Sequence, residues 1–333
     1  MNLIVPMAGM GKRLRPHTLT IPKPLLPIAG KTIVQRLVED IAQVSEESIE
    51  EIAFVIGKFG DEVESQLKKI AADIGAAPKI YYQDEALGTA HAILCAKSSL
   101  VGKTIVAFAD TLFQADFSLD EKQDGIIWVK KIEDPRAFGV VKLNDDNIIT
   151  DFVEKPDVFV SDLAIIGIYY FKDGNYLKEE LEYVIDNDIK DKGEYQLTTA
   201  LENMKQKGVK FSPGKVDEWL DCGNKDSTVF TNERVLEYNG NLINDSVQYI
   251  NSEVIPPCFI GANAIIRNSK IGPHVSLGSN TVVENSVINK TIIQNDSMIT
   301  NAKLSNSMIG NHVNFDGKNT QQEVSIGDFS EVK

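Results

Sequence analysis

The sequence predicts an α/β domain with a mostly parallel sheet, followed by a β-solenoid. Strand-like and helix-like patterns alternate in the first third of the chain, and strand-like runs crowd together after Asp110. From about Ile255 onwards, aliphatic residues recur at intervals of about six. We therefore expect two domains, at residues 1–240 and 241–333, and a chain of 333 residues is long enough for two cores.

The first domain is expected to begin with βαβ units. The apolar patterns predict strands at 3–7, 52–56, 80–82 and 105–109, and helices at 33–44, 63–74 and 89–99. Beyond Asp110 they predict strands at 126–129, 139–143, 148–154 and 163–171, and then helices at 176–185, 196–205 and 227–238. The closely spaced strands indicate a mixed insertion beside a parallel core.

The last part of the chain has fewer charges and more Asn, Ser and Gly. Aliphatic residues such as Ile260, Ile266 and Ile271 are spaced by about six, and a glycine often follows one of them. This pattern is typical of a triangular coil in which each hexad forms one flat side and its aliphatic residue points inward. A β-sandwich with Asn-rich turns is the alternative.

The composition excludes several classes of function. Lys and Arg total 34 against 48 Asp and Glu, so the net charge of −14 disfavours general binding to nucleic acid or anionic membranes. An anionic substrate must then meet a local basic site. We expect a cytoplasmic protein, because the N-terminus has no signal-peptide pattern, no apolar run approaches a membrane span, and the three cysteines lack metal-type spacing.

A glycine-rich, cationic loop follows the first expected strand. Ala8, Gly9 and Gly11 allow close approach of the backbone to an anion, and Arg13 and Lys23 add positive charge. A Gly-x-Gly alone fits a solvated surface loop equally well. The loop matches neither a Walker motif nor a dinucleotide fingerprint, because Gly-Lys-Ser/Thr and the third glycine are missing.

The whole string is more specific than its glycines. Gly9 to Thr18 reads GMGKRLRPHT, and Pro22 to Pro27 reads PKPLLP. It resembles the opening loop of sugar nucleotidyltransferases, the family of glucose-1-phosphate thymidylyl-, uridylyl- and adenylyltransferases. The resemblance covers the whole chain. It implies a Rossmann-like mixed-sheet nucleotidyltransferase domain followed by a left-handed parallel β-helix of hexapeptide repeats.

The resemblance also implies roles for the loop. Ala8, Gly9 and Gly11 would bind the nucleotide, Arg13 would hold the β- and γ-phosphates, and Lys23 would hold the α-phosphate in the transition state. Lys12 departs from the pattern, because it replaces the usual Thr or Ser.

The run Gln83 to Ala92 follows an expected strand and opens an expected helix. A side-chain amide and a nearby backbone can read a pyrimidine edge, and a helix N-terminus favours an anion. The resemblance places base recognition at Gln83 and Gly88, with Thr89 also binding the nucleotide. A helix merely capped by Thr89 is the structural alternative. The sequence leaves UTP and dTTP both open.

Two aspartates are the candidate ligands of a Mg²⁺ cofactor. Asp110 ends a buried strand, and ligands bind at the carboxyl ends of strands in open α/β sheets. Asp221 lies in the sequence Trp219-Leu220-Asp221-Cys222-Gly223, which resembles the family's Trp-x-Asp-x-Gly motif. The hypothesis requires both carboxylates to converge on one ion. A strand-end Asp by itself is also a common turn residue.

The expected sugar-phosphate site follows in the same order as in the family. Glu154 would accept hydrogen bonds from sugar hydroxyls, Lys155 and Lys192 would hold the phosphate, and Gly139 and Gly167 would contribute backbone. Two residues depart from the pattern: Lys192 replaces an Arg and loses its bidentate fork, and Thr199 replaces an Asp. The asparagine of acetylglucosamine-specific members is missing before Gly167, which favours glucose 1-phosphate.

The implied activity is joining of a pyrimidine nucleoside triphosphate to a sugar 1-phosphate, with release of pyrophosphate. An acyltransferase acting through the hexapeptide repeats is one alternative, with His274 or His312 as base, although both are expected at exposed corners. A non-catalytic regulatory homologue is another. We expect no nucleic-acid or membrane partner, and self-association into a homo-oligomer.

Overall fold

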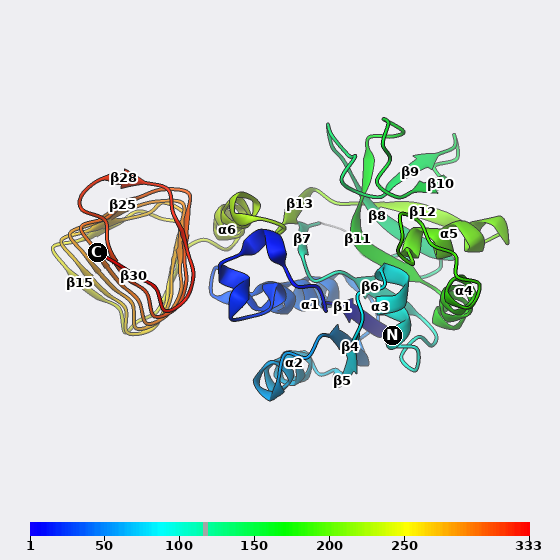
Figure 1. Cartoon of the computed structure of the whole chain (residues 1–333), viewed down its shortest axis with the longest axis horizontal. Coiled ribbons are helices and arrows are strands. Elements are labelled where there is room, and N and C mark those ends of the chain that lie inside the picture. Colours follow the sequence, from blue (N-terminus) through cyan, green and yellow to red (C-terminus); the bar gives the residue numbers. More distant parts are fainter. Residues whose placement is uncertain (116–118) are drawn as a thin grey trace. The chain divides into compact units, whose positions relative to one another are not determined.

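The structure is a computed structural model that describes residues 1–115 and 119–333 (Figure 1). The chain packs into two compact units. The first comprises residues 1–9 and 35–219, and the second comprises residues 10–34 and 220–333. These units differ from the expected division at residue 240, because the glycine-rich segment and the helix before residue 240 pack with the C-terminal repeats.

A nine-stranded mixed sheet forms the centre of the first unit. Its strands are β1 (Asn2–Pro6), β4 (Glu51–Ile56), β5 (Ala77–Tyr82), β6 (Thr104–Ala107), β8 (Gly125–Lys131), β9 (Val140–Leu143), β10 (Ile149–Val153), β11 (Leu163–Phe171) and β12 (Phe211–Lys215). The main path is β10-β9-β11-β6-β1-β4-β5, and β8 joins β12 to β11. β6, β1, β4 and β5 are parallel, whereas β11 is antiparallel to β6, β8 and β9. The expected parallel core and mixed insertion are thus one continuous sheet.

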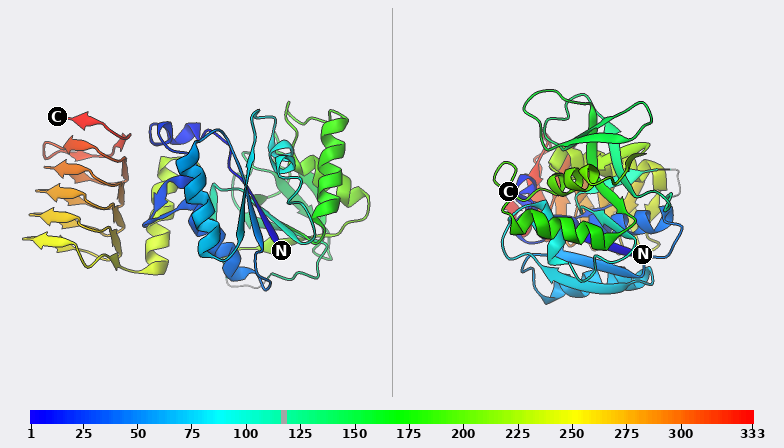
Figure 2. Two further views of the ribbon diagram at one scale, coloured as in Figure 1. Left: turned by 90° about the horizontal axis from the view of Figure 1, so that it is seen from below. Right: turned by 90° about the vertical axis from the view of Figure 1, so that its right-hand side faces the viewer.

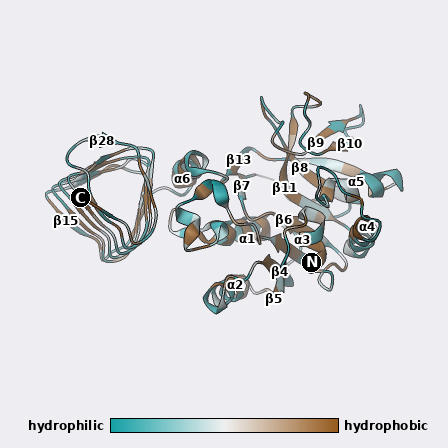
Figure 3. Ribbon diagram, viewed as in Figure 1, coloured by the Kyte–Doolittle hydropathy of each residue, from teal (hydrophilic) through white to brown (hydrophobic). Residues whose placement is uncertain are grey.

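Three helices pack together on this sheet: α3 (Thr89–Cys95), α4 (Gly174–Asp186) and α5 (Leu197–Gln206). Their apolar faces share one core with buried strand residues, and Ile93, Leu181 and Leu201 are fully buried in it. Helices α1 (Ile33–Val44) and α2 (Asp61–Asp73) appear where the sequence predicts them. α3 ends four residues earlier than expected. Figure 3 shows hydrophobic residues along the sheet strands and a mixed surface on α2.

Three strands that begin in the first unit had no sequence signal: β7 (Thr111–Gln114), β12 and β13 (Glu218–Asp221). β12 reads FSPGK, and its Pro and Gly hide the strand. It forms nonetheless, because it pairs in parallel with the buried strand β8, Phe211 opposite Gly125. β13, whose first two residues belong to this unit, pairs with β7.

The second unit begins with a segment of short elements at residues 10–34. It contains three 3₁₀ turns, η1 (Lys12–Leu14), η2 (His17–Leu19) and η3 (Lys23–Leu25), and the hairpin of β2 (Pro27–Ile28) and β3 (Lys31–Thr32). The unit continues with α6 (Lys225–Asn239), where Asn224 caps the first turn by accepting a hydrogen bond from the Ser227 backbone N–H at 3.0 Å.

The rest of the second unit is the β-helix that the repeats predict. Its first face contains β14 (Leu242–Ile243), β17 (Cys258–Ile260), β20 (Val275–Leu277), β23 (Thr291–Ile293), β26 (Ser307–Ile309) and β29 (Ser325–Ile326). Its second contains β15 (Gln248–Ile250), β18 (Ile265–Arg267), β21 (Val282–Glu284), β24 (Met298–Thr300), β27 (Asn314–Asp316) and β30 (Glu331–Val332). Its third contains β16 (Glu253–Val254), β19 (Lys270–Ile271), β22 (Val287–Ile288), β25 (Lys303–Leu304) and β28 (Gln321–Gln322). All pairings within these faces are parallel, and Figure 2 shows the stacked coils of the left-handed helix.

The coils are slightly shorter than three full hexads. Ile260 pairs with Leu277, 17 residues on, and Leu277 pairs with Ile293, 16 residues on. Aliphatic side chains such as Ile266 and Ile288 are fully buried inside the coil, as expected. Asparagines turn many corners in the left-handed conformation, for example Asn268 at φ 46°, which asparagine adopts more readily than most residues. This explains why Asn is frequent in the last part of the chain.

Among the described residues, no helix is both long and apolar enough to cross a membrane. The cysteines Cys95, Cys222 and Cys258 are all free.

Candidate active site

The cationic loop lies in the second unit and is built around Gly11. Gly11 has φ 57°, and its carbonyl accepts hydrogen bonds from the Leu14 backbone N–H at 3.0 Å and from the Thr18 hydroxyl at 2.9 Å. A Cβ at residue 11 would lie 2.9 Å from the Cβ of Lys23. The positive φ and this close approach both require glycine. The two cationic sequence motifs, Gly9 to Thr18 and Pro22 to Pro27, therefore meet at Gly11.

Arg13 and Asp221 meet beside Gly223 in the second unit. A Cβ on Gly223 would lie 2.9 and 3.0 Å from the two Asp221 carboxylate oxygens and 3.1 Å from Nη2 of Arg13. Within residues 1–115 and 119–333, neither side chain forms an ion pair, so both charges remain available. The missing Cβ leaves room at a carboxylate, and hard carboxylate oxygens suit Mg²⁺. Asp221 is therefore a fitting ligand for that ion.

Asp110 lies in the first unit, three residues beyond the end of β6. Burial raises the pKa of the Tyr169 phenol, and the Glu154 and Asp110 carboxylates raise it further. Both carboxylates are therefore near enough to this buried tyrosine of β11 to act on it electrostatically. Tyr169 was missed at the sequence level, because it lies in an apolar strand pattern that carries no functional signal.

Gly167 shapes the backbone beside Asp110. It has φ 88°, and its carbonyl accepts a hydrogen bond from the Phe108 backbone N–H at 2.9 Å. This bond joins β11 to the stretch between β6 and Asp110. Gly167 therefore lies close to the candidate metal ligand in the fold, although the two are far apart in sequence.

Gln83 and Gly88 lie together at the start of α3. The Nε2 of Gln83 donates to the Gly88 carbonyl at 3.3 Å. Gly88 has φ 117°, and a Cβ there would lie 2.4 Å from the Tyr195 carbonyl oxygen, so no other residue fits. The two residues that the family resemblance assigns to base recognition are thus neighbours.

Thr89 does not cap α3. Its hydroxyl donates to the Gln196 side chain at 3.1 Å and accepts from the Leu197 backbone N–H at 2.9 Å, so it ties α3 to the start of α5. The capping alternative is therefore wrong. The hydroxyl is thus already engaged within the protein.

His91 fixes the orientation of the Gln83 amide, a role that the sequence did not reveal. Its Nδ1 lies 3.1 Å from Nε2 of Gln83. The Gly88 carbonyl can only accept, so the Gln83 atom facing it must be the amide nitrogen, and Nδ1 of His91 accepts the second proton. The Gln83 oxygen has no recorded partner in the described parts of the chain and is left as an acceptor.

The expected sugar-phosphate residues form a group in the first unit. Lys155 Nζ lies 3.2 Å from a Glu154 oxygen, and the Thr198 hydroxyl donates to the other oxygen at 3.3 Å. Lys192 donates to the Lys155 carbonyl. A Cβ at Gly139 would lie 3.2 Å from that second Glu154 oxygen. Glu154 is largely buried and both lysines are half exposed, which suits a polar ligand bound from solvent.

The two histidines of the acyltransferase alternative differ from each other. His312 is exposed and stacks on Phe329, as expected for a corner residue. His274 is not exposed: its Nδ1 lies 3.4 Å from Glu233 and its Nε2 lies 3.3 Å from Glu237, both on α6. Lys290 also pairs with Glu233 at 3.1 Å. These contacts, together with the ion pair between Lys290 and Glu233, indicate a structural role for His274 at the contact with α6.

Known proteins resemble this chain in sequence. The model of the family described as nucleotidyl transferase matches residues 3–237. The bifunctional protein GlmU of Methanocaldococcus jannaschii is 33% identical over 243 residues, which are 71% of this chain and 55% of the relative. The low-salt glycan biosynthesis nucleotidyltransferase Agl11 of Haloferax volcanii is 30% identical over 244 residues, 69% of this chain and 64% of the relative. The matched part covers less than two thirds of either relative.

Solved structures share the fold. A putative glucose-1-phosphate thymidylyltransferase from Bacillus anthracis aligns with a TM-score of 0.60 at 24% identity, covering 70% of this chain and 94% of that one. A UDP-glucose pyrophosphorylase in complex with UDP-glucose aligns with a TM-score of 0.59 at 24% identity, covering 71% and 98%. With a family match over residues 3–237 and the α/β fold of these structures, the chain belongs to the nucleotidyl transferase family.

Proposed function

We propose that the protein transfers a nucleotidyl group from UTP or dTTP to a sugar 1-phosphate, with glucose 1-phosphate as the preferred acceptor. The observation that carries this proposal is the meeting of the exposed Arg13 with the Asp221 carboxylate at Gly223. A cation beside a carboxylate with room for an ion is what a metal-bound triphosphate requires. The family match and the grouping of Glu154, Lys155 and Lys192 support the second substrate.

In this reaction an oxygen of the sugar phosphate forms a bond to the α-phosphorus, and the bond from that phosphorus to the bridging oxygen of pyrophosphate breaks. The attacking phosphate is already an anion, so no side-chain base is needed. The protein then contributes positioning and charge neutralisation. Arg13 would neutralise the β- and γ-phosphates, and Lys23 would neutralise the α-phosphate as charge develops.

Asp110 and Asp221 would hold Mg²⁺. The ion, when bound, supplies charge neutralisation at the phosphates and a template for their orientation. Asp110 belongs to the first unit and Asp221 to the second.

The Gln83 amide supports a pyrimidine that has an N3–H group. Its nitrogen is held by the Gly88 carbonyl and His91, and its oxygen can accept that N3–H. Cytosine has an unprotonated N3 that would oppose the Gln83 oxygen. Uracil and thymine both fit this pattern, so the proposal includes UTP and dTTP and disfavours CTP.

The sugar preference rests on the residue before Gly167. Ile166 is 1% exposed, so its side chain belongs to the core and offers no polar group to an acetamido substituent. Glu154 would accept hydrogen bonds from sugar hydroxyls, and Lys155 and Lys192 would hold the phosphate. We therefore propose glucose 1-phosphate ahead of its N-acetylated analogue.

The experiment is a matrix of five nucleoside triphosphates against several sugar 1-phosphates with Mg²⁺. Pyrophosphate release is measured, and the NDP-sugar is identified by mass spectrometry. We expect release only when UTP or dTTP and a sugar 1-phosphate are both present, with glucose 1-phosphate giving the highest kcat/KM. Absence of pyrophosphate with every pair would overturn the proposal. Transfer from acetyl-CoA to an amino-sugar phosphate in a parallel reaction would support the acyltransferase instead.

A further inference from the structure

The segment that carries the phosphate-binding cations packs with the β-helix. Residues 10–34 include Arg13 and Lys23, and they belong to the same compact unit as residues 220–333. Before α1 begins at Ile33, the regular structure of this segment consists of three 3₁₀ turns and a hairpin of two short strands. Such a segment gains little order from its own hydrogen bonds, so its conformation depends on what it packs against.

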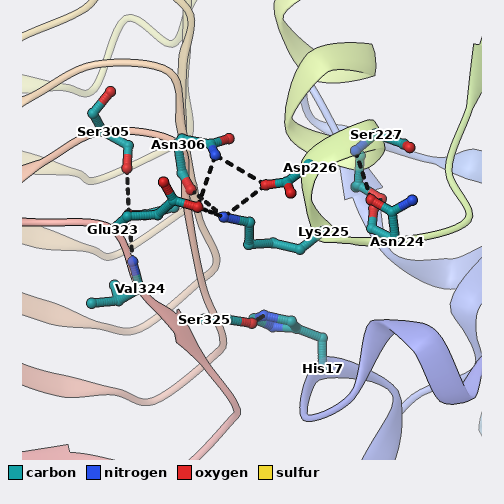
Figure 4. A network of polar contacts seen from close by, with 12 residues as sticks. His17, Asn224, Lys225, Asp226, Ser227, Ser305, Asn306, Glu323, Val324 and Ser325 are labelled. Atoms are coloured by element: carbon teal, nitrogen blue, oxygen red, sulfur yellow. Dashed lines mark hydrogen bonds and ion pairs between the residues drawn. The ribbon is translucent and has the colours of Figure 1, made fainter.

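The last β-helix coil contacts the segment just after Arg13. His17 is buried, and its Nε2 lies 3.1 Å from the Ser325 hydroxyl (Figure 4). The Thr20 hydroxyl donates to an Asp328 carboxylate oxygen at 2.7 Å. Between these contacts, a Cβ at Gly327 would lie 2.9 Å from the Cβ of Pro16, so the two backbones are in close contact.

A second set of contacts follows Lys23. The Ala29 backbone N–H and the Ser276 hydroxyl both donate to the Oδ1 of Asn232, at 3.0 and 2.6 Å. Asn232 is on α6 and fully buried, so it links the segment to β20 of the β-helix. The ring of Phe259 also lies where a Cβ of Gly30 would be, at 2.2 Å.

Helix α6, which carries Asn232, is itself attached to the coils of the β-helix. Lys225 of α6 donates to the Asn306 carbonyl at 2.8 Å and pairs with Glu323 (Figure 4). The Asn306 side chain donates to Asp226 at 2.9 Å. The start of α6 is therefore held on the same side of the β-helix as Ser325.

The residues that contact the β-helix are connected to Arg13 and Lys23 by a few covalent bonds and hydrogen bonds. Thr18, the residue after His17, donates to the Gly11 carbonyl, and Gly11 lies against the Cβ of Lys23. Arg13 is four residues from His17. A shift of η2 on the β-helix would move the backbone that places both cations, and transition-state stabilisation falls steeply with misplacement.

We infer that the β-helix positions the triphosphate loop, and that Ser325 and Asp328 are positioning residues for nucleotidyl transfer. This inference rests on the proposed function. The β-helix then serves the reaction directly. The last coil of the β-helix holds η2. The early coils of the β-helix, together with α6, hold the hairpin of β2 and β3. Loss of the contacts made by His17 and Thr20 should loosen Arg13 and Lys23 without unfolding either unit.

The test uses the full chain with Thr20→Val combined with Ser325→Ala. Valine keeps the volume of Thr20 and removes the donor, whereas Thr20→Ser keeps the donor and should retain activity. Thr320→Val is the matched control, because Thr320 is an exposed β-helix residue bonded only to its own coil. For pyrophosphate release we expect the double variant to lose about three- to tenfold in kcat and to raise the KM for the nucleotide, the scale of one or two lost hydrogen bonds. The KM for the sugar phosphate should stay at the wild-type value, and the Tm should fall by no more than a few degrees, because only one or two hydrogen bonds are lost.

Hydrogen exchange gives a second measurement that is independent of activity. Amides of residues 11–20 should exchange about tenfold faster in the double variant, while amides of the inner coils keep their protection. Unchanged kinetics together with unchanged exchange in a folded double variant would overturn the inference. If the wild type releases no pyrophosphate with any substrate pair, the proposed function fails, and the exchange data alone decide whether the last coil orders the loop.

Discussion

The Nδ1 of His91 lies 3.1 Å from Nε2 of Gln83, and this contact determines which end of the Gln83 amide faces outward. With the Gly88 carbonyl on the same nitrogen, the amide oxygen is left to accept a hydrogen bond. In the proposed function, His91 would therefore influence base selection through Gln83, without touching the base.

Replacing His91 by alanine should release the Gln83 amide to rotate. We expect kcat/KM for UTP or dTTP to fall about three- to tenfold, because one oriented hydrogen bond is weakened. The ratio of kcat/KM for UTP to that for CTP should also fall. Steady-state pyrophosphate release with each nucleotide measures this. His312→Ala is the control, since His312 lies on the exposed surface of the β-helix. An unchanged ratio of UTP to CTP efficiency in His91→Ala would contradict the role of His91.

Arg13→Ala and Asp110→Ala should each lower turnover on the order of 10²-fold or more, because each removes charge complementary to the reacting phosphates. The exposed residues Arg136 and Asp145 provide matched controls, as Arg136→Ala and Asp145→Ala. Circular dichroism and Tm should be unchanged in all four variants. Full turnover in either site variant would remove that residue from the proposed mechanism.

Gly223→Ala should reduce activity with little loss of fold. The φ of Gly223 lies outside the left-handed region, so alanine suits the backbone, but its Cβ would lie about 3 Å from both Asp221 oxygens and Arg13 Nη2. These side chains must shift, so we expect kcat to fall about tenfold and the Mg²⁺ concentration for half-maximal rate to rise. A Mg²⁺ titration of initial rates checks this. A variant with wild-type rates at low Mg²⁺ would show that the room beside Gly223 is unimportant.

His17 should make the protein less stable in acid. Burial lowers the pKa of His17 to about 4, and the nearby Asp328 carboxylate opposes that shift only in part. The unfolded chain, with a His pKa near 6.5, then binds the proton more tightly. The contribution of His17 is fully present above pH 6.5 and is lost as the pH falls towards 4, by up to about 3 kcal/mol.

The measurement compares His17→Gln with the wild type, because glutamine cannot titrate. The free energy of unfolding is determined for both proteins in urea at pH 7.5 and pH 4.5. Between pH 7.5 and pH 4.5, the free energy of unfolding should fall more for the wild type than for the variant. The carboxylates titrate in both proteins, so their effect cancels when the two losses are compared. An equal loss in both proteins would mean that His17 keeps an ordinary pKa in the fold.

The local spacing of apolar residues predicted most helices and strands of the fold. The aliphatic spacing of about six predicted the β-helix, because an inward-facing residue on each flat side is a purely periodic requirement. The coils can be slightly shorter than three hexads, because a corner that loses a residue, as between Leu277 and Ile293, leaves the inward residues in place. β12 was missed because its Phe211-Ser212-Pro213-Gly214 run has no strand pattern and depends on pairing with β8.

The residues of the candidate site also fall into those that the sequence predicts and those that only the structure reveals. The motifs predict Gln83, Gly88, Arg13 and Asp221 as site residues, because ligand chemistry demands particular residue types in a particular order. His91, Tyr169 and Gly223 have no such signal. Their contributions depend on the fold: His91 orients an amide, Tyr169 is buried where the Glu154 and Asp110 carboxylates raise its pKa, and Gly223 has no Cβ beside Asp221 and Arg13.

The sequence by itself determined the family, the alternation of strand and helix, and the repeat of the β-helix, since each follows from residue types at fixed spacing. Only the tertiary structure decided that residues 10–34 pack with the β-helix, through His17 on Ser325 and Thr20 on Asp328. These partners are 308 residues apart in the chain. No local pattern encodes such a contact, because it exists only once the coils have closed and brought their last turn against the loop.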